Sequence, residues 1–341
     1  MDIDNVMRLV RENIRNLAPY STARDEYKGG IGVFLDANEN PYNNGYNRYP
    51  DPRQTTLKEL LSQIKGIAPQ SMFIGNGSDE AIDLCFRIFC EPRVDNVVTI
   101  APTYGMYRVS AAINDVEVRE VQLGEDFSLP TAALLSACDQ NTKLMFICSP
   151  NNPTGNSFSI EQMRWILEYF DGVLIVDEAY IDFSSEASAT TLLAEYDNLI
   201  VLQTLSKAYG LAALRLGLAF AHPQVMQLFA NVKYPYNINL AGMERAAQLL
   251  TRDVETQIKN IKSERARMAQ ALEGMQCVKR VYPSDANFLL VKVDDAKNVY
   301  NKLINAEVIV RDRSGVKGCE ECLRITIGTP EENDRLLQIM A

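Results

Sequence analysis

The segment "TLSKAYGLAALRLG", residues 204–217, contains only two cationic side chains among small and apolar residues. Lys207 follows an apolar run that is typical of a strand, and Arg215 lies about two helical turns further on. A lysine that is partly removed from water has a lowered pKa and acts as an amine nucleophile, whereas an arginine beside hydroxyl groups suits a phosphate. We expect a helix that holds both cations on one face, with the hydroxyls of Thr204 and Ser206 nearby.

Two glycine-containing turns could contribute polar contacts to the same ligand. "GNGSDE", residues 75–80, lies between a predicted strand and a predicted helix. Its glycines permit a close backbone approach, and the free N–H groups of the helix start suit a phosphate, although an ordinary capped helix would look similar. "SPNNPTGN", residues 149–156, is typical of a turn after a strand.

A pair of acidic residues closes another apolar run, "GVLIVDEAY", residues 172–180. A carboxylate such as Asp177 or Glu178 at that position is partly desolvated and needs a cationic or N–H partner. An amine nucleophile, a phosphate-binding turn and a carboxylate for a protonated pyridine nitrogen are together the requirements of pyridoxal 5′-phosphate. The four motifs therefore indicate a site for this cofactor.

The elements that must position these motifs alternate between strands and helices from about residue 70 to 220. Strands are predicted at 71–76, 96–101, 115–121, 143–149, 172–178 and 198–204. Near-continuous apolar strands joined by helical crossovers indicate an α/β fold with a mainly parallel central sheet and helices on both faces. Ligands in such sheets bind beyond the carboxyl ends of the strands, where the four motifs fall.

We divide the chain into three parts. Residues 1–45 form an N-terminal helix and an extended arm, residues 46–240 a large cofactor-binding domain, and residues 241–341 a smaller α+β domain. A long helix over about 241–273 is predicted to lead from the large domain into the small one. The arm is rich in Pro and Asn, so we expect it to lie over a neighbouring surface.

Composition narrows the class of protein. The net charge of −10 disfavours nucleic acid and anionic membranes as general partners. Seven cysteines favour free thiols, and the first residues lack the apolar core of a signal peptide, so a cytoplasmic location is expected. Cys319 and Cys322 have no second CxxC beside them, and His222 is the single histidine, so no metal site is expected. Acid–base chemistry must then use Lys, Tyr, Asp or Glu.

The combination of "NPTG", "DEAY" and "TLSKAYGLAALRLG" resembles the fold-type I pyridoxal-phosphate aminotransferases of classes I and II, and the likeness covers essentially the whole chain. It implies that Lys207 carries the cofactor covalently and that Asp177 pairs with the pyridine nitrogen. Asn152 and Tyr180 would bond to the phenolic oxygen of the cofactor, and Tyr104 would stack on its ring. The phosphate would be bound by Gly77, Ser78, Asp79, Thr204, Ser206 and Arg215.

Within that family, "VRENIRNLAPY", "LDANENPY", "NRYPDPRQ" and "CLRITIGTPEEN" are similar to the members that act on L-histidinol phosphate in histidine biosynthesis. The resemblance implies that Tyr20 and Asn38 line the substrate pocket. Tyr49 would reach the cofactor phosphate of the other subunit, which implies a homodimer. Arg324 would bind the anionic end of the substrates with Arg311, and Arg313, on the same face of an extended strand, stays an alternative to Arg311.

The implied reaction transfers the amino group of L-histidinol phosphate to 2-oxoglutarate and yields imidazole-acetol phosphate and L-glutamate. Planar arginines that bind either a phosphate or a carboxylate suit this pair of substrates. Three alternatives share the motifs: an aromatic or broad-specificity aminotransferase, a threonine-phosphate decarboxylase, and a non-catalytic regulator that binds the cofactor.

Overall fold

In this computed structural model the chain is described over residues 1–20 and 32–341, which form a seven-stranded and a four-stranded sheet. The larger sheet has the strand order β1-β7-β6-β5-β4-β2-β3, with β7 antiparallel to both neighbours and the other pairs parallel. Its strands are β1 (Met72–Asn76), β2 (Asn96–Ala101), β3 (Glu117–Gln122), β4 (Thr142–Cys148), β5 (Val173–Asp177), β6 (Leu199–Thr204) and β7 (Leu216–Phe220). The predicted α/β class is confirmed, with a mixed rather than purely parallel central sheet.

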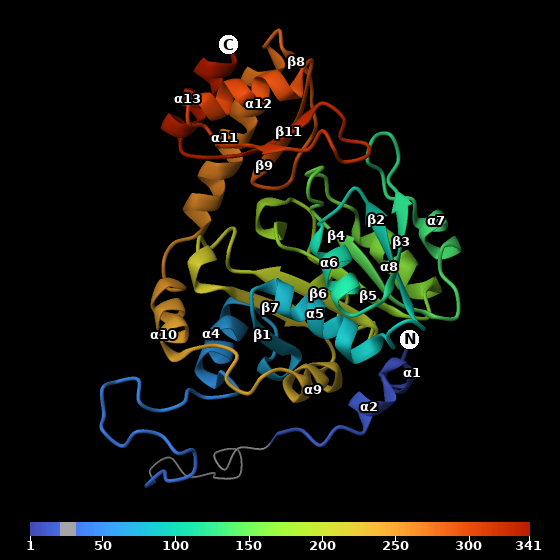
Figure 1. Ribbon diagram of the computed structural model, residues 1–341, viewed down its shortest axis with the longest axis vertical. Helices are drawn as coiled ribbons and strands as arrows, with labels where there is room; N and C mark the ends of the chain where they lie inside the picture. Colours follow the sequence, from blue (N-terminus) through green and yellow to red (C-terminus); the bar gives the residue numbers. More distant parts are fainter. Residues whose placement is uncertain (21–31) are drawn as a thin grey trace.

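Helices cover both faces of this sheet (Figure 1). On β2, Val97 packs into one hydrophobic core and its neighbour Val98 into the other, because successive side chains of a strand point to opposite faces. The helices around the larger sheet are α1 (Ile3–Leu9), α2 (Glu12–Arg15), α4 (Thr55–Lys65), α5 (Ser78–Phe89), α6 (Met106–Ile113), α7 (Thr131–Ser136), α8 (Ile160–Tyr169), α9 (Pro223–Val232) and α10 (Leu240–Leu249). Burial on two faces explains why the central strands read as continuous apolar runs.

The smaller sheet has the order β10-β11-β9-β8 and is antiparallel throughout. It consists of β8 (Val278–Val281), β9 (Phe288–Val293), β10 (Arg311–Asp312) and β11 (Cys322–Thr326). Three helices pack with it around a separate core: α11 (Glu255–Glu273), α12 (Ala296–Asn305) and α13 (Pro330–Met340). Figure 1 shows this unit beyond one edge of the larger sheet, with α11 running between the two.

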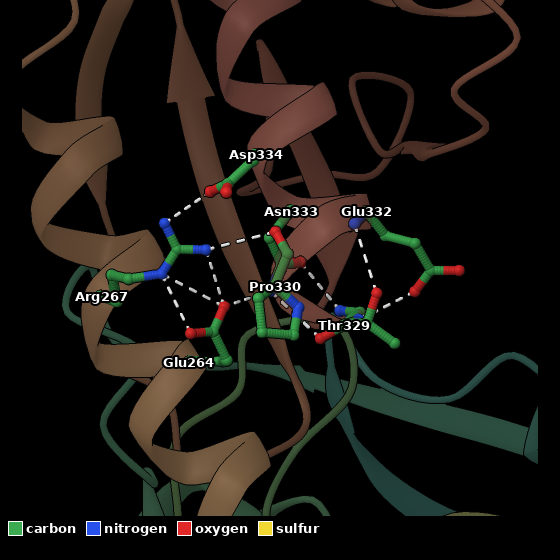
Figure 2. A network of polar contacts seen from close by, with 8 residues as sticks. Glu264, Arg267, Thr329, Pro330, Glu332, Asn333 and Asp334 are labelled. Atoms are coloured by element: carbon green, nitrogen blue, oxygen red, sulfur yellow. Dashed lines mark hydrogen bonds and ion pairs between the residues drawn. The ribbon is translucent and has the colours of Figure 1, made fainter.

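A polar network fastens the start of α13 to α11 (Figure 2). Thr329 caps α13: its hydroxyl accepts from Glu332 N at 3.3 Å, and the Glu332 carboxylate accepts from Thr329 N at 2.8 Å. The buried amide of Asn333 donates to Glu264 Oε2 at 2.8 Å. Arg267 of α11 bridges Glu264 and Asp334. The N-terminus of α13 is therefore capped, and an ion pair to Arg267 attaches this helix to α11.

Residues 204–217 do not form the predicted helix. After β6 the chain makes a turn, a short 3₁₀ helix over Ala212–Leu214 and then β7, with Arg215 in the left-handed region at a φ of 55°. The turn contains Gly210 at a φ of 65°, which interrupts a right-handed helix. β7 must also begin at Leu216 to fill the space between β1 and β6. Lys207 therefore comes from a turn and Arg215 from the start of a strand, and the two do not share a helix face.

The long helix predicted over 241–273 is two helices. α10 ends at Leu249 and α11 begins at Glu255. Between them Thr251 bonds back to Gln248 O at 2.9 Å and Asp253 accepts from Thr256 N at 3.1 Å, so short polar side chains bond to the backbone and compete with helix continuation. The buried face of α10 packs in the core of the larger sheet.

The arm from residue 32 to 50 extends from the body of the molecule in Figure 1 and has no helix or strand. Tyr49 at its end stacks on Tyr236, with ring centroids 4.4 Å apart. No helix in the described part of the chain is long and apolar enough to cross a membrane.

Candidate active site

A cavity of about 140 Å³ lies at the carboxyl ends of β4, β5 and β6, beside the start of α5. It brings together the four motifs that the sequence singled out. Its lining comprises Gly77, Ser78, Asp79, Tyr104, Cys148, Asn152, Asp177, Ala179, Tyr180, Thr204, Ser206, Lys207, Ala212 and Arg215. Every residue that we expected to contact the cofactor within one chain therefore borders one cavity.

One end of the cavity is a cradle of backbone and cationic groups. α5 begins without a side-chain cap, so the N–H groups of its first turn remain available. Gly77 N donates to Arg215 O at 2.7 Å, which ties the helix start to the turn that carries the arginine. A Cβ at Gly217 would lie 2.1 Å from Ser78 N, so only glycine lets β7 approach this closely. The Arg215 guanidinium is half exposed and lies 3.8 Å from Asp79 Oδ2.

Asp177 lies at the floor of the cavity and is fully buried. Its Oδ2 accepts from the Tyr107 hydroxyl at 2.7 Å and its Oδ1 from Ala179 N at 3.1 Å. Burial raises the pKa of this carboxyl to about 6, although the Tyr107 and Ala179 donors oppose that rise. Among the described residues this carboxylate has two donors and no cation in contact, so a protonated ring nitrogen suits it as a further partner.

Glu178, the next residue, faces away from the cavity. Its carboxylate accepts from Ser188 Oγ at 2.6 Å, Ala189 N at 2.6 Å and Gln203 Nε2 at 3.0 Å. Burial raises its pKa to about 7. Of the two acidic residues that close β5, one therefore borders the cavity and the other holds a buried loop.

Lys207 projects into the cavity from the turn after β6, with Nζ 5.7 Å from the centre of the Tyr180 ring. The pKa of its ammonium is lowered, first by desolvation and then by the cations of Arg324 and Arg215. A lowered pKa increases the fraction of free amine, which is the nucleophilic and basic form. The structure thus supports the chemistry expected of this lysine.

Asn152 and Tyr180 both border the cavity, with Asn152 Nδ2 3.5 Å from the Tyr180 hydroxyl. Arg324 of β11 reaches these residues from the small domain and donates from Nη1 to Asn152 Oδ1 at 2.6 Å. Tyr104 borders the cavity as expected, and its hydroxyl donates to Asp79 Oδ1 at 3.0 Å.

The remaining predicted substrate residues do not line this cavity within the described chain. Tyr20 borders a second hollow beside α9, and Asn38 and Tyr49 border a third one with Tyr236. Arg311 is exposed on β10, directly opposite Arg324 on β11. Their assignment to the substrate site and to the partner subunit stays a prediction.

Tyr107 is a site residue that the sequence reasoning missed. It is buried on α6, stacked against Phe146 at 4.9 Å and edge-on to Tyr104 at 5.7 Å. Its position three residues after Tyr104 was the available signal, although Tyr104 lies just before α6 and not on its face. An apolar helix face explains such a tyrosine equally well, so its bond to Asp177 was not predictable.

The chain belongs to the aminotransferase class I and II family, whose family model matches residues 30–340. It is 53% identical over 334 residues to the histidinol-phosphate aminotransferase of Parabacteroides distasonis, covering 97% of each chain. Among solved structures it is similar to the histidinol-phosphate aminotransferase of Clostridium acetobutylicum, with a TM-score of 0.79, 23% identity and coverage of 86% and 89%. The enzyme of that name from Sinorhizobium meliloti, solved with pyridoxal 5′-phosphate, gives a TM-score of 0.79 at 24% identity, covering 85% and 81%.

The cavity residues fit pyridoxal 5′-phosphate, the cofactor of this family. The buried carboxyl of Asp177 has room for a pyridinium partner, and the uncapped start of α5 with Arg215 suits the phosphate. The lowered pKa of Lys207 suits covalent attachment to an aldehyde carbon. The chain is therefore a pyridoxal-phosphate-dependent aminotransferase.

Proposed function

We propose that this enzyme transfers the amino group of L-histidinol phosphate to 2-oxoglutarate, giving imidazole-acetol phosphate and L-glutamate, in histidine biosynthesis. The observation that carries the proposal is one cavity in which Lys207, Asp177 and Arg215 converge, in a chain that matches a histidinol-phosphate aminotransferase over 97% of its length. A cytoplasmic location accords with a biosynthetic role of this kind.

The bound cofactor supplies an electron sink for the carbon that carries the amino group. Lys207 would hold the cofactor covalently, and its Nζ, once freed, would take up the proton from that substrate carbon and return it during the transfer. Asp177 would pair with the protonated pyridine nitrogen from a buried position. Asn152 and Tyr180 would bond to the phenolic oxygen.

We further propose that the active enzyme is a homodimer in which Tyr49 of each chain binds the cofactor phosphate of the partner. Tyr49 does not line the cavity of its own chain, and it lies at the end of an arm that extends from the body. Its stacking on Tyr236 fixes the end of the arm next to the larger domain. We assign Tyr20 and Asn38 to the substrate pocket because the resemblance to this family implies that role.

A half-reaction tests the substrate. Holoenzyme is mixed separately with L-histidinol phosphate, phenylalanine and threonine phosphate while the visible absorbance of the cofactor is followed. We expect rapid loss of absorbance with L-histidinol phosphate and glutamate formation once 2-oxoglutarate is added. A rapid change with phenylalanine alone would assign an aromatic aminotransferase, and carbon dioxide release from threonine phosphate would assign a decarboxylase.

A further inference from the structure

Two carboxylates stand in the first turn of α5, the helix start that suits the phosphate of the cofactor. Asp79 and Glu80 are the second and third residues of this helix. A helix N-terminus attracts any nearby anion, so these side chains compete with a phosphate for the same free N–H groups. They also repel the phosphate by their charge. The phosphate site therefore needs groups that hold the two carboxylates aside.

Asp79 is held by residues of the cavity itself. Its Oδ1 accepts from the Tyr104 hydroxyl at 3.0 Å, and its Oδ2 lies 3.8 Å from the Arg215 guanidinium. Both partners border the cavity together with Asp79. This carboxylate is therefore paired with a phenol and a cation of the cofactor site.

Glu80 is held on the other side of the helix start, and it is not among the described residues that border the cavity. A glutamate at the third position of a helix commonly accepts from the N–H of the capping residue. Here Gly77 N donates to Arg215 O, and Glu80 Oε2 accepts from Asn76 N at the end of β1. A Cβ at Gly75 would lie 3.2 Å from Glu80 Oε2, so this glycine leaves space for the carboxylate beside β1.

The side-chain amide of Asn237 completes the hold on this carboxylate. Its Nδ2 lies 3.2 Å from Glu80 Oε1 and 3.1 Å from Oε2, and it also donates to Ile74 O at 3.0 Å. Its Oδ1 accepts at 3.0 Å from Gln54 Nε2, which donates to Pro52 O as well. Backbone carbonyls only accept, so they fix the orientation of both amides. Within the described part of the chain, Asn237 is the only side chain that donates to Glu80.

We propose that Asn237 is a positioning residue for the cofactor phosphate: its amide holds the Glu80 carboxylate against β1 and leaves the N–H groups at the start of α5 to the phosphate. Without this amide the carboxylate keeps one backbone donor, from Asn76, and can turn toward the helix start. The inference concerns the cofactor, so it does not depend on which substrate the enzyme uses. Neither Asn237 nor Glu80 borders the cavity, so both act through the helix start.

The test compares two ligands that differ only in the phosphate, pyridoxal 5′-phosphate and pyridoxal. Their Kd values are measured by fluorescence titration of the full-length chain freed of cofactor. The variants are Asn237→Ala, Glu80→Gln and the double variant, and Asn301→Ala, an exposed asparagine on α12, is the matched control. The ratio of the two Kd values isolates the contribution of the phosphate, because ring and aldehyde are the same in both ligands.

A lost hydrogen bond to a charged group corresponds to about 10- to 100-fold in an equilibrium constant. We expect Asn237→Ala to raise the Kd of pyridoxal 5′-phosphate by about 10-fold, at the lower end of that range, because Asn76 N still restrains the carboxylate. The Kd of pyridoxal should change by less than about twofold. A neutral glutamine does not compete for the helix start, so Glu80→Gln and the double variant should bind both ligands within about threefold of wild type. Asn301→Ala should behave as wild type.

An unchanged Kd of pyridoxal 5′-phosphate in Asn237→Ala would overturn the inference. An equal loss of affinity for both ligands would also overturn it, because that result indicates a structural role. Failure of Glu80→Gln to restore binding in the double variant would show that the Glu80 charge is not what the amide restrains.

Pyridoxal binding at the wild-type Kd also shows that a variant is folded. If Asn237→Ala does not fold, Asn237→Asp takes its place, because it keeps the volume of the side chain and sets a second carboxylate opposite Glu80. The same loss, confined to the phosphorylated ligand, is expected from it, and equal binding of both ligands at their wild-type Kd values would overturn the inference.

Discussion

The cofactor end and the substrate end of this active site differ in how their polar groups are satisfied. At the cofactor end, Asp177 has two donors and the start of α5 is tied to Arg215 through Gly77. At the end proposed to bind the substrate, Arg313 Nε and Arg324 Nε are buried and have no hydrogen-bond partner among the described residues. The cofactor end therefore has its polar groups paired within the chain, whereas the other end keeps unpaired donors on cationic side chains.

The largest effect is expected from Lys207→Ala, which breaks the chemistry of the cofactor end. Removing the amine eliminates both the covalent attachment and the base, so transamination should fall by at least about 10³-fold. The variant should still bind cofactor, because the contacts of Asp177 and Arg215 remain. Glutamate formation and cofactor absorbance measure the two effects, and Lys297→Ala, an exposed lysine on α12, is the control. Activity within tenfold of wild type would contradict the role of Lys207.

The second-largest effect is expected from substitutions of the two buried carboxyls at the end of β5. Asp177→Asn keeps the shape but removes the charge opposite the pyridine nitrogen, so we expect kcat to fall by about 100-fold or more and cofactor affinity to fall with it. Glu178→Gln is the matched control, since the Glu178 carboxylate accepts from Ser188, Ala189 and Gln203, and none of these three residues borders the cavity. Equal losses in the two variants would mean that general stability, not the cofactor contact, accounts for the result.

The cofactor end was the more predictable half from the sequence. Lys207, Asp177 and Asn152 follow apolar strands, and parallel strands bring their carboxyl ends to one edge, so the motifs sufficed to place them together. The predicted helix between Lys207 and Arg215 was wrong, because the small and apolar residues there resemble a helix while the sheet requires β7. Apolar spacing alone does not distinguish these outcomes.

The substrate end was less predictable because its residues come from separate elements. Arg311 and Arg313 are two residues apart, and the sequence left open which one contacts the substrate. In the structure Arg311 is exposed and Arg313 is half-buried, a difference that depends on the packing of the smaller sheet. The bond from Tyr107 to Asp177 is likewise a tertiary contact, formed between residues 70 apart in the chain.

A smaller effect sharpens the role of Tyr107 at the cofactor end. The pKa of Asp177 in the cofactor-free protein is about 6, so the carboxyl is ionised above that pH and protonated below it. Because the pyridinium requires the ionised form, cofactor affinity should decrease as the pH falls through about 6. The Tyr107 hydroxyl lowers the pKa of Asp177, so Tyr107→Phe should move the midpoint upward, by about one pH unit.

Cofactor binding to the apoenzyme, measured from pH 5 to 8 by fluorescence titration, checks this midpoint. The phosphate of the cofactor also titrates near pH 6, so Asp177→Asn supplies the profile that the phosphate alone produces. A midpoint that is the same in wild type and in Tyr107→Phe would show that the bond is structural only.

The smallest effect concerns the smaller domain, which carries the arginines that are proposed to bind the substrate. Thr329→Ala removes the hydroxyl that caps α13 and one half of the capping box with Glu332 (Figure 2). We expect the free energy of unfolding to fall by about 1 kcal/mol. Thr56→Ala, an exposed position inside α4, is the control and should change it by less than about 0.5 kcal/mol. Urea unfolding measures both variants.

Because this cap lies in the smaller domain, cofactor affinity should stay at the wild-type value in Thr329→Ala. A loss of cofactor affinity would mean that the two ends are coupled through the domain packing and are not independently organised.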